Sequence, residues 1–194
     1  MILSLYQNDR TVFRLKDVAL LTGETNFQNL NNKLNYYVRT GKLENPRKGI
    51  YTKPNFSTEE LACKIYVPSY ISLEYVLQKA GVVFQYDSKI TVVSYLSRTI
   101  EVAGGEYIFR KLKGEILTNL VGIERQKNHV NIATPERAFL DLLYLNKDYH
   151  FDNLNPLKKQ VVFKFLPHYQ SKSLTTLVKK LLTKNYGGVK KEKR

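Results

Sequence analysis

The segment TNFQNLNNKLNYYVRTGKLENPRKGIYTK, residues 25–53, joins a helical pattern of apolar residues to a short basic turn. Apolar side chains recur at steps of three and four residues, which is the spacing of one buried face of an α-helix. Thr25 and Gln28 have the spacing of a capping box, and Gly41 suits the position after a helix end. We therefore predict a helix that ends at Gly41 and buries Phe27, Leu30, Leu34 and Val38.

The opposite face of this helix is rich in amide side chains instead of the lysines and glutamates that usually cover a solvated face. It holds Gln28, Asn29, Asn32, Asn35, Tyr36 and Arg39. Asn and Gln can form bidentate hydrogen bonds to adenine, Arg can form them to guanine, and a helix fits the major groove of DNA. The pattern predicts a DNA-reading face. As alternatives, Gln28 fits a simple cap residue equally well, and Tyr36 or, more readily, Tyr37 packs beneath the following turn.

The residues before this segment indicate a helix-turn-helix arrangement. A short helix is expected over residues 2–6, and a second over FRLKDVALLTG, whose Gly23 suits the left-handed position after a helix end. The apolar residues at helical spacing in the second helix are Leu15, Val18 and Leu21. Helix-turn-helix proteins consist of a helix, a short turn and a second helix, and they place the polar outer face of the second helix against DNA.

The residues after the helix predict a wing. KLENPRKGIY is typical of two short strands around a turn at Asn45-Pro46 and Arg47-Lys48-Gly49. Arg47 and Lys48 near the tip would reach a phosphate group or the minor groove, and the alternative is a solvated charged turn. Residues 1–56 are therefore expected to form a winged helix-turn-helix domain. Its predicted DNA-binding residues are Thr25, Asn26, Gln28, Asn29, Asn32, Lys33, Asn35, Tyr36, Arg39, Arg47 and Lys48.

The charge of the chain fits a polyanionic partner. Its 194 residues carry a net charge of +14, which favours nucleic acid first and an anionic membrane or an acidic partner second. The excess lies at the ends, with 9 basic against 4 acidic residues in 1–56, 10 against 9 in 57–140 and 12 against 4 in 141–194. The single cysteine, Cys63, excludes an intramolecular disulfide, and we expect a buried helix residue in a cytoplasmic protein. We expect neither a signal peptide nor a membrane span.

A second domain is expected after KPNFST, residues 53–58, where Pro54 interrupts the structure. STEELACKIY begins with a capping box and predicts a helix, and another is expected over residues 73–80. TPERAFLDLLYLN predicts a helix with Thr134 as its cap and Pro135 at its first position. The residues that this helix is expected to bury are Phe139, Leu142 and Leu143.

The middle of the chain has the composition of a sheet. Residues 89–135 are rich in Ile, Val, Tyr and Thr, and predict four or five antiparallel strands with turns at Gly104-Gly105 and at residues 126–128. The expected fold class is therefore α+β. An N-terminal winged helix-turn-helix is followed by a mixed domain, residues 57–194, with an antiparallel sheet and C-terminal helices.

The last part of the chain is helical and basic. NPLKKQVVFKFLPHY and SLTTLVKKLLTKN predict two helices, and residues 185–194 predict a disordered basic tail. Lysines on the outer faces of these helices offer a cationic surface, for which the alternative is a solubilising helix face. The lysines of this surface are Lys158, Lys159, Lys179, Lys180 and Lys184.

The chain lacks the motifs of common catalytic sites. Gly104-Gly105 has no following GKS or GKT, and no Gly-Ser precedes an Asp-x-Asp pair of the kind that two-metal nucleotidyl transfer needs. The histidines stand alone, without metal-site spacing, at His129, His150 and His168. Three aspartates are interpreted as a helix-surface charge and two loop residues, in preference to a metal-binding trio: Asp141, Asp148 and Asp152. We expect a protein without enzymatic activity, cofactor or metal.

Four segments in this order give the chain a resemblance to a known family. They are LKDVALLTG, LNYYVRTGKLENPRKGIYTKP, YVPSYISLEYVLQKAGV and NIATPERAFLDLLYL. The chain resembles, over nearly its whole length, the AbiEi-type antitoxins of bacterial abortive-infection systems against phage. Its most specific parts are RKGIY, YISLEYVL and IATPERAFLDLLYL, and Tyr75 departs from the small residue expected at its position.

The resemblance implies two activities. In that family an N-terminal winged helix binds inverted repeats in the promoter of its own operon and represses it. The C-terminal domain counters a nucleotidyltransferase toxin encoded next door, in a type IV arrangement without a stable complex. Because one winged helix covers few base pairs, we expect two copies to act on DNA, as a dimer or cooperatively. The alternative is a ligand-responsive winged-helix transcription factor with no antitoxin role, which the neighbouring gene would distinguish.

Overall fold

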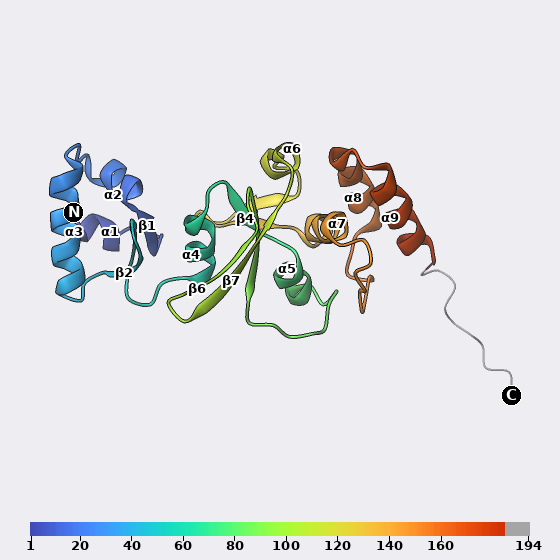
Figure 1. Ribbon diagram of the computed structural model, residues 1–194, viewed down its shortest axis with the longest axis horizontal. Helices are drawn as coiled ribbons and strands as arrows, with labels where there is room; N and C mark the ends of the chain where they lie inside the picture. Colours follow the sequence, from blue (N-terminus) through green and yellow to red (C-terminus); the bar gives the residue numbers. More distant parts are fainter. Residues whose placement is uncertain (185–194) are drawn as a thin grey trace, which may run out of the picture.

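The computed structural model describes residues 1–184 as an α+β chain with its helices at both ends and a large sheet between them (Figure 1). The N-terminal part packs three helices against a three-stranded antiparallel sheet of order β1-β3-β2. Its helices are α1 (Ile2–Tyr6), α2 (Leu15–Thr22) and α3 (Phe27–Arg39), and its strands are β1 (Val12–Arg14), β2 (Glu44–Arg47) and β3 (Ile50–Thr52). The buried residues of this part are Leu5, Phe13, Val18, Leu30, Leu34, Leu43 and Tyr51.

The three predicted N-terminal helices are present, but the start of α3 differs from the prediction. The helix cap is Asn26, whose Oδ1 accepts a hydrogen bond from the Asn29 amide at 3.0 Å, so the predicted capping box of Thr25 and Gln28 is wrong. Asn is as good a cap as Thr, and it stands one residue closer to the apolar repeat. Phe27 was expected in the core and is instead 49% exposed. Strand β1 was not predicted.

The predicted hairpin is present, but its turn is shorter than predicted. Residues Lys48 and Gly49 form the turn, whereas Asn45 and Pro46 lie within β2. The Asn45 amide donates to the Ile50 carbonyl at 2.8 Å across a register shift in β2, which stabilises an irregular strand. β2 is the edge of its sheet, where a proline without an N–H is tolerated.

The rest of the chain is built around a six-stranded sheet of order β6-β7-β5-β4-β9-β8. β4 pairs with β9 and β5 with β7 in parallel, and the other neighbours are antiparallel, so the sheet is mixed where a purely antiparallel one was predicted. The β6–β7 hairpin folds back so that β7 lies beside β5 and runs in the same direction. The strands are β4 (Ser69–Ile71), β5 (Ile90–Ser94), β6 (Arg98–Val102), β7 (Gly105–Lys111), β8 (Ile123–Arg125) and β9 (Asn131–Ala133).

The helices around this sheet largely follow the predicted segments, except that α6 was not predicted. They are α4 (Thr58–Ile65), α5 (Glu74–Lys79), α6 (Gly114–Thr118), α7 (Pro135–Leu145), α8 (Lys159–Phe165), the 3-10 helix η1 (Leu166–Tyr169) and α9 (Lys172–Lys184). The side chain of Thr134 caps α7 as predicted, by accepting from the Arg137 amide. α7 lies between the sheet and the pair α8 and α9 (Figure 1), and buries Phe139, Leu142 and Leu143 as predicted.

Helix α7 also carries a buried ion pair, which corrects the interpretation of Asp141 as a helix-surface charge. Arg137 and Asp141 are 1% and 0% exposed, and Arg137 Nε donates to Asp141 Oδ1 at 3.1 Å. Asp141 also accepts from the hydroxyls of Ser72, Tyr70 and Tyr169. The guanidinium donates as well to the carbonyls of Ile116 and Val121, which join the α6 region to α7. This network therefore connects β4, α6, α7 and η1.

The two parts of the chain are joined by contacts between β1, α2 and α4. The buried carboxylate of Glu60 accepts hydrogen bonds from the backbone amides of Thr11 and Val12 at 2.6 and 2.9 Å. Ser57 caps α4 as predicted, but the Glu60 side chain is turned to β1 and does not complete the predicted capping box. Arg14 Nε donates to the Lys64 carbonyl at 2.7 Å. The buried hydrophobic residues nevertheless form two clusters, with Val12 in the larger one. The proposed boundary at residues 56 and 57 stays a prediction, and the predicted tail 185–194 lies outside the described residues.

Candidate nucleic-acid interface

Helix α3 lies at one end of the molecule, with its outer side turned away from the rest of the chain (Figure 1). On its inner side Leu30 and Leu34 are fully buried, and no residue of α3 is acidic. The structure brings most of the predicted DNA-binding residues together here. Those exposed on or just before α3 are Thr25, Asn26, Gln28, Asn29, Asn32, Lys33, Asn35, Tyr36 and Arg39.

The amide groups on the outer side of α3 have no partners of their own. The side chains of Asn29, Asn32 and Asn35 form no hydrogen bond within residues 1–184, whereas the oxygen of Asn26 is already used as the helix cap. Gln28 is exposed and does not serve as a cap. These free amides can therefore donate and accept hydrogen bonds with an external group, such as the edge of a base.

The cationic residues of α3 flank these amides. Lys33 Nζ pairs with Glu24 at 2.8 Å, and the hydrogen bond from Lys33 lowers the pKa of the Glu24 carboxyl. Arg39 lies exposed in the last turn. Tyr36 is 51% exposed and its ring meets that of the half-buried Tyr37 edge to face at 5.6 Å. A DNA phosphate would therefore meet Arg39 directly and would compete with Glu24 for Lys33.

The hairpin residues are separate from this surface. Arg47 is half-buried, its guanidinium lies 5.3 Å from the ring centre of Tyr66, and its Nη2 donates to the Tyr66 hydroxyl at 3.3 Å. The Gly49 carbonyl accepts from the Leu15 amide at 3.1 Å, which directs the hairpin turn toward the start of α2 and the end of α4. Arg47 thus has a partner within the protein, while Lys48 is exposed at the turn.

The predicted C-terminal lysines are not equivalent. Lys158, Lys179 and Lys180 are exposed, but the ammonium group of Lys159 donates to the Leu182 carbonyl at 2.9 Å near the end of α9. A cation at that position stabilises the end of a helix. Lys184 is the last residue of α9, and its side chain lies outside the described part of the chain.

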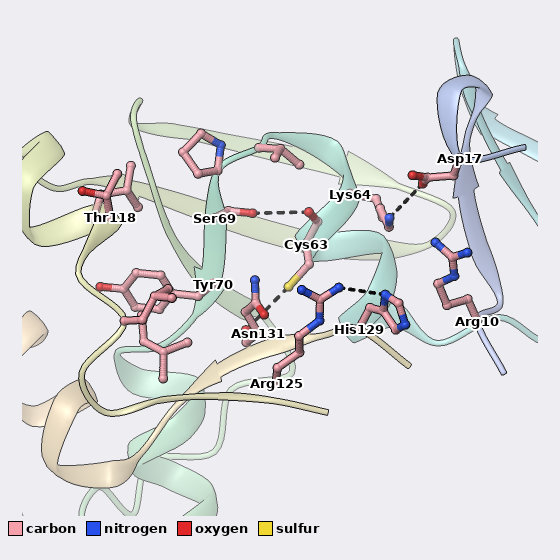
Figure 2. Close-up of a pocket in the computed structure, with 15 residues that line it drawn as sticks. Arg10, Asp17, Cys63, Lys64, Ser69, Tyr70, Thr118, Arg125, His129 and Asn131 are labelled. Carbon is pink, nitrogen blue, oxygen red and sulfur yellow. Dashed lines mark hydrogen bonds and ion pairs between the residues drawn. The ribbon is translucent and has the colours of Figure 1, made fainter. Parts of the chain in front are cut away.

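A cavity of about 470 Å³ lies where the N-terminal part meets the β8–β9 edge of the larger sheet (Figure 2). Arg10 reaches it from the N-terminal part, Lys64 from α4, and Arg125 and His129 from the two sides of the β8–β9 turn (Figure 2). Arg125 Nη2 lies 2.9 Å from His129 Nδ1. Because a guanidinium can only donate, Nδ1 is the acceptor and the proton of the neutral ring is on Nε2.

The electrostatics of this cavity favour an uncharged imidazole. Partial burial, together with the positive charges of Arg10, Arg125 and Lys64, lowers the pKa of His129. Cys63 also lines the cavity, and burial raises the pKa of its thiol to about 11, in agreement with the predicted buried residue. Arg10 and Arg125 were not predicted as site residues. The available signal was ERQKNH, where an arginine and a histidine flank a predicted turn and a hairpin brings them together.

No protein-family model matches the chain, and no curated protein matches it either. Within residues 1–184, no helix combines the length and apolar character needed to cross a membrane. No group of three or more His, Cys, Asp and Glu residues in this part of the chain is arranged to hold a metal ion. Of the three predicted aspartates, Asp141 is buried in the α7 network, and Asp152 accepts from the Phe84 amide at 2.8 Å.

Proposed function

We propose that the protein is a sequence-specific DNA-binding repressor of its own promoter and the antitoxin of a type IV toxin-antitoxin system. The observation that carries the DNA-binding half is the outer side of α3, where free amides are exposed beside Lys33 and Arg39 and the helix itself has no acidic residue. Helices α2 and α3, followed by the β2–β3 hairpin, are in the order of a winged helix-turn-helix.

In this proposal α3 enters the major groove. Asn29, Asn32 and Asn35 follow one another at three-residue steps, so their amides lie along one side of the helix and meet successive base edges. Arg39 and Lys33 contact phosphates or guanine. Thr25, Asn26, Gln28 and Tyr36 complete the surface, and Lys48, at the separate hairpin turn, would contact a phosphate group outside it. Two copies bind an inverted repeat, either as a dimer or cooperatively.

The antitoxin half of the proposal is supported by the resemblance to the AbiEi-type antitoxins and by the exposed lysines of the C-terminal helices. Lys158, Lys179 and Lys180 are exposed, and α8 and α9, on or next to which they stand, lie at the end of the molecule opposite α3 (Figure 1). This cationic surface would engage an acidic face of the nucleotidyltransferase toxin or compete for its anionic substrate, without forming a stable complex. Repression and protection would then use opposite ends of one chain.

A second candidate is a ligand-responsive winged-helix transcription factor without antitoxin activity. The cavity between the N-terminal part and the β8–β9 edge favours it, because a ligand there would contact both parts of the chain. A nucleotidyltransferase-like toxin gene directly beside this gene supports the antitoxin, and its absence supports the second candidate.

The experiment that tests the DNA-binding proposal is titration of the full chain into labelled promoter DNA and into random DNA of equal length, at about 0.15 M salt. A repressor binds its own promoter with much higher affinity, since specific complexes exceed non-specific ones by about 10³-fold or more. Equal affinity for the two DNAs would show that the protein is not a specific repressor.

A further inference from the structure

The cavity between the N-terminal part and the β8–β9 edge has a cationic end. Arg10, Lys64 and Arg125 line it with permanent positive charges, and Asp17 is the one lining carboxylate within residues 1–184. The negative charge of Asp17 is neutralised by Lys64, whose Nζ lies 2.8 Å from the Asp17 Oδ2. The cavity therefore keeps the equivalent of two uncompensated positive charges, those of Arg10 and Arg125, beside the uncharged ring of His129.

These cationic groups are held in place but remain available to a ligand. Arg10 Nε donates to Asn8 Oδ1 at 3.1 Å, and its guanidinium lies 5.6 Å from the ring centre of Phe13. One Nη of Arg125 faces His129, and the remaining donors of both arginines have no carboxylate partner within residues 1–184. Such groups are preorganised to donate hydrogen bonds to a phosphate.

Apolar side chains also line the cavity, and two of them are open to solvent. Leu120 is 72% exposed and Val67 is 53% exposed, although both are large hydrophobic residues, and both line this cavity. Ile123 and Pro68 are further apolar residues in the lining, and Ser69 and Thr118 contribute hydroxyl groups. The side-chain amide of Asn131 also lines the cavity without a hydrogen-bond partner in the described part of the chain. A lining of apolar side chains with a few polar groups, among them one free amide, is suited to a heterocycle.

We propose that this cavity binds a mononucleotide, with its phosphates against Arg10, Arg125 and His129 and its base against apolar lining residues such as Leu120 and Val67. The cavity volume of about 470 Å³ lies within the range of small-molecule sites, roughly 300–1,000 Å³. The ligand would contact the N-terminal part through Arg10 and the larger sheet through Arg125. This site is distinct from the α3 surface.

The test is calorimetric titration of the full chain with ATP, AMP, adenosine and inorganic phosphate, repeated with GTP, CTP and UTP. We expect saturable binding of at least one nucleotide, and at least tenfold weaker binding of its nucleoside and of phosphate alone, because each fills one end. Arg125→Gln and His129→Asn should each weaken nucleotide binding about tenfold or more. Asn is chosen because His129 has a φ of 67°, a conformation that Asn tolerates.

Matched controls separate this site from the DNA surface. Lys127→Gln lies in the same β8–β9 turn but does not line the cavity, and should leave nucleotide binding unchanged. Arg39→Ala on α3 should weaken promoter binding and leave nucleotide binding intact. The proposal is overturned if no nucleotide binds saturably, or if phosphate alone binds as well as every nucleotide. It is equally overturned if Arg125→Gln weakens promoter binding while nucleotides do not bind, since the cations would then serve the DNA backbone.

Discussion

The carboxylate of Asp141 lies at the centre of the buried hydrogen-bond network of α7. It is fully buried and pairs with Arg137. It also accepts hydrogen bonds from three hydroxyl groups, those of Tyr70 in β4, Ser72 just after β4, and Tyr169 in η1. A buried pair of this kind is costly to break, because the remaining partner keeps its charge without compensation. The sequence interpretation of Asp141 as a surface charge failed because its partners Tyr70, Ser72 and Tyr169 are distant along the chain.

Asp141→Asn should therefore lower the free energy of unfolding by about 3–5 kcal/mol, since it leaves the Arg137 guanidinium buried and unpaired. Urea unfolding followed by circular dichroism measures the difference. Asp148→Asn is the matched control, because Asp148 is exposed, and a change within about 0.5 kcal/mol is expected. If both variants unfolded at the same urea concentration as the unmodified chain, Asp141 would not stabilise the fold in this way.

Helices with an apolar repeat and a capping residue were the elements that the sequence predicted best. Local signals determine them: Ser57 and Thr134 cap α4 and α7 as expected, and Gly23 adopts the left-handed conformation after α2. Strand direction was not predictable, because alternation of side chains is the same in parallel and antiparallel strands. The α3 surface could be predicted from one helical face, whereas the cavity could not, since it joins residues from several elements.

Glu60 links α4 to β1, and its removal tests how strongly the two parts of the chain depend on each other. Glu60→Ala leaves the Thr11 and Val12 amides without their acceptor, at an expected cost of about 1–3 kcal/mol for each amide that stays buried. Urea unfolding should show this loss, while Glu101→Ala on the exposed edge strand β6 should change little. An unchanged midpoint for Glu60→Ala would mean that the contact between α4 and β1 adds nothing to stability.

The proposed domain boundary predicts that residues 57–194 fold on their own, because they contain the six-stranded sheet and most of the larger hydrophobic cluster. Without β1, the Glu60 carboxylate becomes hydrated and the fragment should be less stable than the full chain. We expect 57–194 to protect cells from the toxin without repressing the promoter, and 1–56 to give no protection. A folded 57–194 fragment that fails to protect, or protection by 1–56, would contradict the division of activities.

The two ends of the molecule are expected to be separable by mutation. Changing Lys158, Lys179 and Lys180 together to Glu should reduce protection from the toxin. Promoter affinity should stay within about twofold, because α8 and α9 lie at the opposite end of the molecule from α3 (Figure 1). Lys159 is left unchanged, since it contacts the Leu182 carbonyl. Protection assays and promoter titrations on the same variant measure both effects. Full protection by the folded triple variant would show that these lysines form only a solubilising surface.

Salt dependence reports how many cations of the α3 surface contact phosphates. Affinity for the promoter should fall steeply with salt, and the slope of log K against log salt concentration should decrease by about 0.9 for each phosphate contact removed. Lys33→Ala and Arg39→Ala are each expected to show this decrease. Lys172→Ala, on the exposed side of α9, is the matched control and should leave the slope unchanged. Equal slopes for all these variants would place the phosphate contacts elsewhere.

The decisive measurement is promoter affinity of an Asn29→Ala and Asn32→Ala double variant, compared with an Asn155→Ala control far from α3. If α3 reads base edges, the double variant loses about 1–3 kcal/mol of binding free energy to the promoter for each amide that contacts a base. Its binding to random DNA should be almost unchanged. Asn155→Ala, a change of an exposed loop amide, should bind both DNAs like the unmodified chain. A correctly folded double variant that still binds its promoter with unchanged affinity and preference would contradict the assignment of α3 as the recognition helix.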